Sequence, residues 1–276
     1  SVSYIEDKME QDEVTLTAKF SANGATLSST SNLTCKLPAT YNGTSQTTSC
    51  TVTAPTITRS GYTIVGFNTS AGSTSNNSSY NTTSKAITLT ASNNNSTWYP
   101  VTYKTLTVTF NANGATLTGT TAPTCNMYNT NTSCSVTAPT ISRSGFTITG
   151  FNTSASATTS QVASGGTATV SANTTYYAIT SKTVTVTFYR NNATSITPSG
   201  GSASTATSLT QSCTIRNSAT TCNITSPAIA APSATPNVIG FNTSSSGTTS
   251  GWSQDTSKSI SSNVTYYAIT SSTAKT

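Results

Sequence analysis

Cysteine is the residue type in this chain best suited to specific chemistry, and six cysteines fall into three local pairs. The pairs are Cys35 with Cys50, Cys125 with Cys134, and Cys213 with Cys222. An even cysteine count in small domains is typical of disulfides made in an oxidising compartment. The alternative is metal binding. Each pair supplies only two thiolates and the chain has no histidine, so a four-ligand zinc site would need two pairs to meet. We expect one disulfide within each pair.

Side chains that catalyse reactions are scarce. General acid–base and nucleophilic catalysis need histidine, paired carboxylates, or an activated thiol or lysine. Histidine is absent, the thiols are expected to be oxidised, and Asp255 is the only acid after residue 13. Ser272 and Lys275 have the S-x-x-K spacing of acyl enzymes, but serine is so frequent here that chance explains the match. We therefore expect a non-catalytic protein with no cofactor and no metal site.

Negative charge is concentrated at the N-terminus. Residues 1–13 hold five acids and one lysine, a net charge of −4, whereas eleven cations and one acid give the rest of the chain +10. The five acids are Glu6, Asp7, Glu10, Asp12 and Glu13. We interpret them as a candidate assembly segment that adds a strand to an open sheet edge of a neighbouring subunit, with opposite charge favouring the register. The cations form no run, which argues against nucleic-acid binding.

One sequence pattern occurs three times and must supply the elements that position the cysteines. The segment VTAPTITRSGYTIVGFNTS at 52–70 returns as VTAPTISRSGFTITGFNTS at 136–154, and in shorter form as NVIGFNTSSS at 237–246. Repetition of one small unit predicts a tandem array whose role depends on reach, stiffness or multivalency rather than on a single active site.

Each copy follows a predicted strand and precedes another. Threonine alternates with apolar residues up to Phe20, Phe110 and Phe188, as in a half-buried strand. Asn-Gly at 23–24 and at 113–114 predicts a tight turn after that strand. A strand with paired aromatic residues closes each repeat, and no segment has the periodicity of an amphipathic helix.

These repeats predict three small sheet domains, each with a thin core that a disulfide would brace. The expected boundaries are 1–13 for the acidic segment, then 14–103, 104–182 and 183–276 for the repeat domains. The links at 100–106 and 178–184 pass almost directly from one predicted strand to the next and do not resemble a flexible tether. We expect an elongated array.

The repeats resemble the internalin B-type repeat, also called the Listeria–Bacteroides repeat, of bacterial extracellular proteins. The matching residues in the second copy are Val108–Phe110, Ala112–Gly114, Pro139–Phe146 with Gly150 and Phe151, and Ala172–Ala178. The resemblance implies a β-grasp-like domain in a secreted or wall-attached protein, with a spacer or adhesive role. The segment between the paired cysteines is not part of the family pattern, and we expect a disulfide-pinned loop where a β-grasp domain packs its helix.

Two functions follow from these patterns. The first is a non-catalytic structural or adhesive protein of a bacterial cell surface, acting as a rigid stalk. The alternative is the protomer of an extracellular filament. Expected partners are further copies of the chain, or a host protein or glycan; Trp98 and Trp252 could stack on sugars, although their strand positions favour a core. No apolar run reaches the length of a membrane span and the start lacks a signal-peptide core, so we expect Ser1 to be a mature or truncated terminus.

Overall fold

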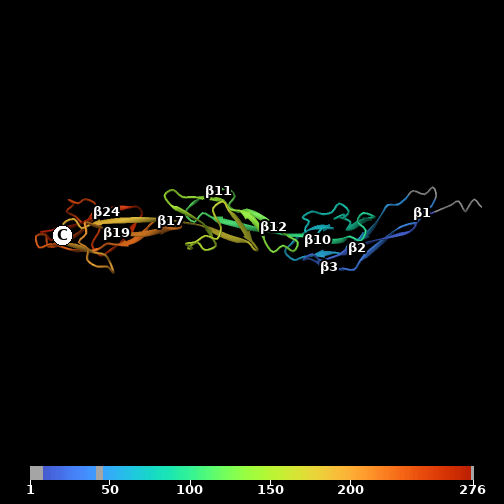
Figure 1. The fold of residues 1–276 in the computed structure, drawn as a ribbon, viewed down its shortest axis with the longest axis horizontal. Helices are drawn as coiled ribbons and strands as arrows, with labels where there is room; N and C mark the ends of the chain where they lie inside the picture. The colour runs from blue at the N-terminus through green and yellow to red at the C-terminus, as the bar shows by residue number, and fades with distance from the viewer. Residues whose placement is uncertain (1–8, 42–45, 275–276) are drawn as a thin grey trace, which may run out of the picture. The chain divides into compact units, whose positions relative to one another are not determined.

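The chain folds into β-strands joined by turns and loops (Figure 1). The computed structural model describes residues 9–41 and 46–274. Within these ranges there is no helix, so none that is long and apolar enough to cross a membrane. The prediction of a mostly β protein is confirmed.

Two compact units divide the chain, and each is described by itself. Unit 1 comprises Ser1–Val108, Pro123–Val136 and Thr169–Asn173; unit 2 comprises Thr109–Ala122, Thr137–Ala168 and Thr174–Thr276. The middle repeat contributes residues to both units, and β13 (Cys134–Thr137) and β16 (Thr167–Val170) do so as well. The expected division into three domains in an elongated array therefore stays a prediction. So does the β-grasp likeness, because such a domain packs a helix on its sheet.

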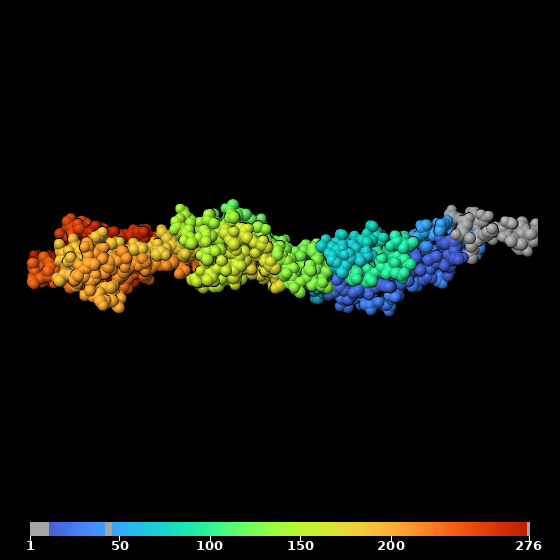
Figure 2. Space-filling view, in the orientation of Figure 1, coloured from blue at the N-terminus to red at the C-terminus, as the bar shows by residue number. Residues whose placement is uncertain are grey.

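The sheet of unit 1 is built on β10 (Thr97–Asn111). β2 (Val14–Phe20) pairs with the start of β10 in parallel, and β8 (Thr63–Asn68) and β12 (Thr124–Tyr128) pair with it antiparallel. β4 (Leu33–Leu37) pairs antiparallel with β2. Early residues of the unit, in blue, thus lie beside later ones, in cyan and green (Figure 2). The small sheets of unit 1 are β1 (Met9–Gln11) with β5 (Thr40–Tyr41), β3 (Thr26–Leu27) with β7 (Ile57–Thr58), and β6 (Ser49–Thr53) with β9 (Ala86–Thr90).

The sheet of unit 2 is built in the same way on β17 (Thr174–Tyr189). β24 (Val264–Ser271) pairs with β17 in parallel, and β15 (Thr147–Asn152) and β19 (Ser208–Arg216) pair with it antiparallel. β22 (Asn237–Asn242) pairs antiparallel with β24. The small sheets of unit 2 are β11 (Thr116–Thr118) with β14 (Thr140–Ser142), β18 (Ser195–Thr197) with β21 (Ala228–Ala230), and β20 (Cys222–Thr225) with β23 (Ser257–Ile260).

Strands β10 and β17 differ from the prediction in an informative way. They contain 15 and 16 residues, whereas a strand is usually about 5–6 residues long. The expected links at 100–106 and 178–184 lie inside these strands. The last strand of one repeat and the first strand of the next are therefore one continuous strand.

Tight turns occur where the Asn-Gly dipeptides predict them. Asn23 and Gly24 have φ values of 48° and 86°, and Asn113 and Gly114 have 48° and 90°. Two successive residues with positive φ make the type I′ turn that matches the twist of paired strands. The third repeat keeps the first of these positions, since Asn191 has a φ of 50°.

A bulge recurs in the strand that carries each Gly-Phe step. The pairing register shifts beside Gly66, Gly150 and Gly240, whose φ values are 153°, 137° and 138°. A Cβ atom on these glycines would lie 2.1, 2.6 and 2.2 Å from the nearest side-chain atom. Glycine is needed here because the backbone conformation is unfavourable for other residues and the space beside it is filled.

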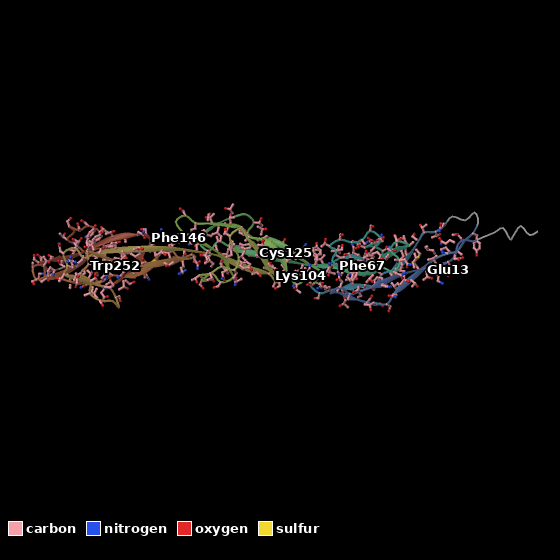
Figure 3. All side chains as sticks on the ribbon, in the orientation of Figure 1. Glu13, Phe67, Lys104, Cys125, Phe146 and Trp252 are labelled. Atoms are coloured by element: carbon pink, nitrogen blue, oxygen red, sulfur yellow. A yellow bond between two sulfur atoms is a disulfide. The ribbon has the colours of Figure 1, made fainter. Side chains whose placement is uncertain are left out.

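Aromatic side chains fill the cores of both units. In unit 1 the ring centroid of Phe67 lies 5.8 Å from that of Phe20 and 5.0 Å from that of Tyr80. In unit 2 the ring of Phe188 lies 5.2 Å from that of Trp252. Figure 3 labels Phe67, which lies in β8, and Trp252, which forms an isolated bridge with Phe241. Trp98 and Trp252 are 0% and 4% exposed, which confirms that they build the core and leaves neither indole free to stack on a sugar.

Candidate functional site

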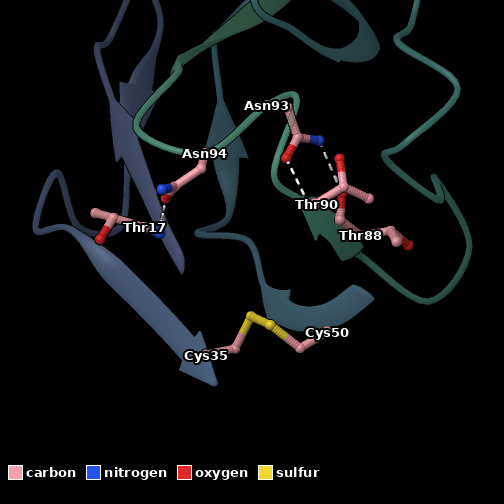
Figure 4. Close-up of a disulfide and its surroundings, with 7 residues drawn as sticks. All are labelled: Thr17, Cys35, Cys50, Thr88, Thr90, Asn93 and Asn94. Carbon is pink, nitrogen blue, oxygen red and sulfur yellow. Dashed lines mark hydrogen bonds between the residues drawn. A yellow bond between two sulfur atoms is a disulfide. The ribbon is translucent and has the colours of Figure 1, made fainter. Parts of the chain in front are cut away.

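Disulfides connect the two kinds of sheet in each repeat. They join Cys35 in β4 to Cys50 in β6, Cys125 in β12 to Cys134 in β13, and Cys213 in β19 to Cys222 in β20. Each bridge ties a strand of the large sheet to a strand of a small one, as Figure 4 shows for Cys35 and Cys50. The sulfur atoms are 2.09, 2.04 and 1.96 Å apart, and no cysteine is left free.

Metal binding finds no support at these cysteines, because both sulfurs of every pair are bonded to each other. Nor do residues 9–41 and 46–274 contain any cluster of three His, Cys, Asp or Glu side chains that could hold an ion.

The acidic segment is only partly described. Glu6 and Asp7 lie outside the described residues, and of Glu10 only the backbone is described, in β1. β1 pairs with β5 of its own unit. Glu13 forms an ion pair with Lys36 at 3.2 Å, but both side chains are more than half exposed, so the pair contributes little stability.

The junction after the first repeat is held by a buried polar cluster in unit 1. The guanidinium of Arg59 lies 3.6 Å over the ring of Tyr62 and donates hydrogen bonds to the Thr102 hydroxyl at 2.9 Å and the Asn129 carbonyl at 2.6 Å. The Asn129 Oδ1 accepts from the Thr102 N–H at 3.2 Å, and its Nδ2 donates to the Ser73 carbonyl at 2.9 Å. Thr102 is fully buried in the middle of β10.

The same cluster recurs in unit 2 after the second repeat. The Arg143 guanidinium lies 3.6 Å over the ring of Phe146 and donates to the Thr180 hydroxyl at 3.0 Å and to the Asn217 carbonyl. The Asn217 side chain accepts from the Thr180 N–H at 3.1 Å and donates to the Ala157 carbonyl at 3.1 Å. Carbonyl oxygens and an aromatic face thus compensate each half-buried cation.

Both asparagines adopt a left-handed backbone. Asn129 and Asn217 have φ values of 54° and 56° and follow the strands β12 and β19 directly. Asparagine tolerates this conformation better than most residues. We call the two sets, Arg59–Thr102–Asn129 and Arg143–Thr180–Asn217, the junction clusters. In the third repeat the Thr270 hydroxyl instead lies 2.7 Å from that of Thr235.

A second asparagine joins the first and last strands of each repeat. Its Oδ1 accepts a hydrogen bond of 2.8 to 2.9 Å from a threonine N–H of the first strand. The pairs are Asn94 with Thr17, Asn173 with Thr107, and Asn263 with Thr185. Figure 4 shows the first pair. The neighbouring Asn93 accepts a hydrogen bond from the Thr90 N–H and donates one to the Thr88 carbonyl.

One comparison with known proteins finds a match to part of the chain. Residues 106–179 match the family model of the Listeria-Bacteroides repeat domain. This stretch is similar in sequence to the Listeria-Bacteroides repeat domain. No curated protein and no solved structure matches the chain. The predicted resemblance is thereby confirmed for the middle repeat, and together with the disulfides it points to an extracellular bacterial protein.

The three repeats share a third asparagine contact, at the tip of the first turn. In each case the side-chain amide donates two hydrogen bonds of 2.9 to 3.0 Å, one to a loop carbonyl and one to a carbonyl of the last strand. The donors are Asn23, Asn113 and Asn191. The turn of each repeat is therefore fastened to its closing strand.

Two hollows lie on the surface of the part of the chain that the structure describes. One of about 220 Å³ in unit 1 is lined by Ile64, Tyr80 and Lys85 among others, and is smaller than the roughly 300 Å³ at which small-molecule sites begin. One of about 580 Å³ in unit 2 is lined mainly by Ser and Thr, with no acid, base or thiol among its described residues. Burial raises the pKa of Tyr80 above its ordinary value of 10.0.

Sequence reasoning missed the junction clusters. Arg59 and Arg143 both reach into the following repeat. The sequence does contain a pattern that could have indicated the clusters, because an asparagine follows Cys125 and Cys213 by four residues in each case. At the corresponding place after Cys35 the chain has Ala39.

Proposed function

We propose that the chain is a non-catalytic spacer of a bacterial cell surface that acts as a rigid stalk. The observation that carries the proposal is the construction of its junctions. At each one a strand runs without interruption from one repeat into the next, and a buried Arg–Thr–Asn cluster fastens the following repeat to the preceding one.

Stiffness follows from the chemistry of these junctions. Bending at Thr102 or Thr180 would break hydrogen bonds to backbone groups that are buried and have no water to replace the lost partner. Leaving such a group unpaired costs about 1–3 kcal/mol. A Gly/Ser tether, by comparison, bends at almost no cost.

Small-angle scattering of the full chain tests the proposal. A compact protein of 276 residues has a radius of gyration of about 19 Å. We expect a stiff monomeric rod, with a radius of gyration well above that value and independent of concentration. A value near 19 Å would contradict the stalk.

The second candidate is a filament protomer whose N-terminal segment docks onto a neighbouring subunit. Its support is the charge contrast between residues 1–13 and the rest of the chain. The pairing of β1 with β5 and of Glu13 with Lys36 occupies part of the segment within its own unit, which is why we prefer the stalk. Deletion of residues 1–13 separates the two. Under the filament hypothesis, fibres seen by electron microscopy disappear while the repeats stay folded.

A further inference from the structure

We propose that the first and third repeats are shear clamps, built to resist tension applied along the chain. The inference rests on the proposed structural role, because a surface spacer is pulled from its ends. It adds the property that the repeat must then have, namely a high force for unfolding from the termini.

The direction of the strands carries the argument. The third repeat opens with the second half of β17 and closes with β24, and these two strands pair in parallel from Val186 with Val264 to Tyr189 with Tyr267. Tension enters at the N-terminal end of β17 and leaves at the C-terminal end of β24. Because the strands are parallel, this pulls them lengthwise in opposite directions, so all hydrogen bonds between them are loaded together.

The first repeat has the same arrangement in unit 1. β2 opens it, and β10 pairs with β2 in parallel through Lys19 and Phe20. Backbone hydrogen bonds of 2.9 to 3.1 Å cross between the two segments. They run from Asn95 to Thr17, from Lys19 to Ser96, and from Ser21 to Trp98. The strand-joining asparagines Asn94 and Asn263 add one bond of 2.8 Å to each clamp.

Neighbouring elements protect the clamp from water. In unit 2, β19 covers the outer edge of β17 over nine residue pairs, and β22 pairs with β24 from Tyr267 to Ser271, at the end of the clamp. Beneath them Val184, Val186 and Phe188 are fully buried. Water therefore has poor access to the hydrogen bonds that tension must break. The load also meets no loop between repeats, because β10 and β17 are continuous.

Single-molecule pulling in two geometries tests the clamp. An azide-bearing residue in place of Ser262 gives a second attachment point; this serine is exposed and lies just before β24. Pulling between the two termini loads the third repeat in shear. Pulling between the N-terminus and position 262 applies the force to the N-terminal ends of both β17 and β24. The hydrogen bonds between the two strands then break one at a time. The first two repeats are loaded identically in both cases and serve as the internal reference.

We expect the unfolding event that releases the chain between Tyr189 and Val264 to need a severalfold lower force in the second geometry, with the other events unchanged. Equal forces in the two geometries would overturn the clamp. Because both forces come from the same folded protein, a change in stability cannot imitate the result. Scattering tests the stalk separately. A compact particle with a strong clamp would contradict the stalk alone, and a rod with equal unfolding forces in the two geometries would contradict the clamp alone.

Discussion

At the scale of single residues, asparagine side chains make many of the directional contacts that hold this protein together. The amide of asparagine can accept and donate at once and its backbone tolerates positive φ, so one residue can both turn the chain and fasten it. Three structural positions use it, at the first turn, before the last strand and at the junctions. In a chain with 7% charged residues, these amides replace ion pairs as the directional contacts.

Replacing Asn129 tests the junction cluster of unit 1. Asn129→Gly keeps the positive φ but removes both side-chain hydrogen bonds, leaving the buried Thr102 N–H without its acceptor. We expect that amide to exchange with solvent faster by a factor matching a loss of about 1–3 kcal/mol. Native-state hydrogen exchange measures this. Asn131→Gly is the control, since Asn131 is exposed, and unchanged exchange at Thr102 in Asn129→Gly would refute the role of the side chain.

Gly66 tests the need for glycine at the bulge. In Gly66→Ala the new Cβ meets the Asn76 Oδ1, which accepts a hydrogen bond from the Phe67 N–H, and the backbone conformation itself costs about 1–3 kcal/mol. We expect a clear fall in the calorimetric unfolding temperature. Gly72→Ala is the matched control in the same unit, because no atom lies within 4 Å of its Cβ. Equal effects of the two substitutions would contradict this explanation.

Tyr80 makes unit 1 sensitive to alkaline pH. Burial raises its pKa in the folded state above the value of 10.0 in the unfolded chain, so the folded state favours the neutral phenol. The resulting stability is fully present below pH 10.0 and is lost as the pH rises through the higher folded value. We expect Tyr80→Phe to lose less stability than the unaltered protein above that pH, as measured by urea unfolding. A phenol that titrates at its ordinary pKa in the difference spectrum of the two proteins would refute it.

Strands could be predicted wherever their apolar residues alternate. The runs that end in Phe20, Phe110 and Phe188 have this pattern and are strands. The small sheets were harder to foresee: β3, β7 and β11 have two or three residues each, too few to show a period among serines and threonines.

The long strands escaped prediction for a different reason. Residues Tyr103, Lys104 and Thr105 are polar enough to indicate a link, but the strand continues through them because they pair with the distant strand β12. Beside them, the N–H of the buried Thr102 donates a hydrogen bond to the side chain of Asn129, 27 residues later. Local periodicity carries no trace of such a contact, whereas the turns and disulfide pairs depend on residues close in sequence and could be inferred.

At the scale of whole elements, the disulfides stabilise the short hairpin sheets against the large ones. Closing loops of 9 and 15 residues is worth about 2.5–3 kcal/mol by the chain-entropy estimate. We expect replacement of Cys213 and Cys222 by serine to lower the unfolding free energy of unit 2 by about that amount, as measured by denaturant titration. Replacement of the exposed Ser218 and Thr220 by alanine is the control, and an equal loss there would exclude the bridge as the cause.

At the scale of the whole molecule, the disulfides also limit how far the chain extends when a repeat unfolds under tension. Each bridge keeps its loop out of the released length. At about 3.5 Å per residue, reduction should lengthen the step that contains Cys213–Cys222 by about 25 Å and the step that contains Cys35–Cys50 by about 45 Å. Force–extension curves with and without a reductant measure the difference. Identical steps would show that the bridges do not close these loops.

A shared strand also determines how such a protein can change its length. Thr102 and Thr180 occupy equivalent places, so a cut after Thr102 rejoined at Ser181 removes one complete period and keeps the strand unbroken. Arg59 would then face Asn217, the counterpart of its present partner. Recombination at either end of such a strand would sever both features, which makes the middle of a strand the natural boundary for duplication and loss.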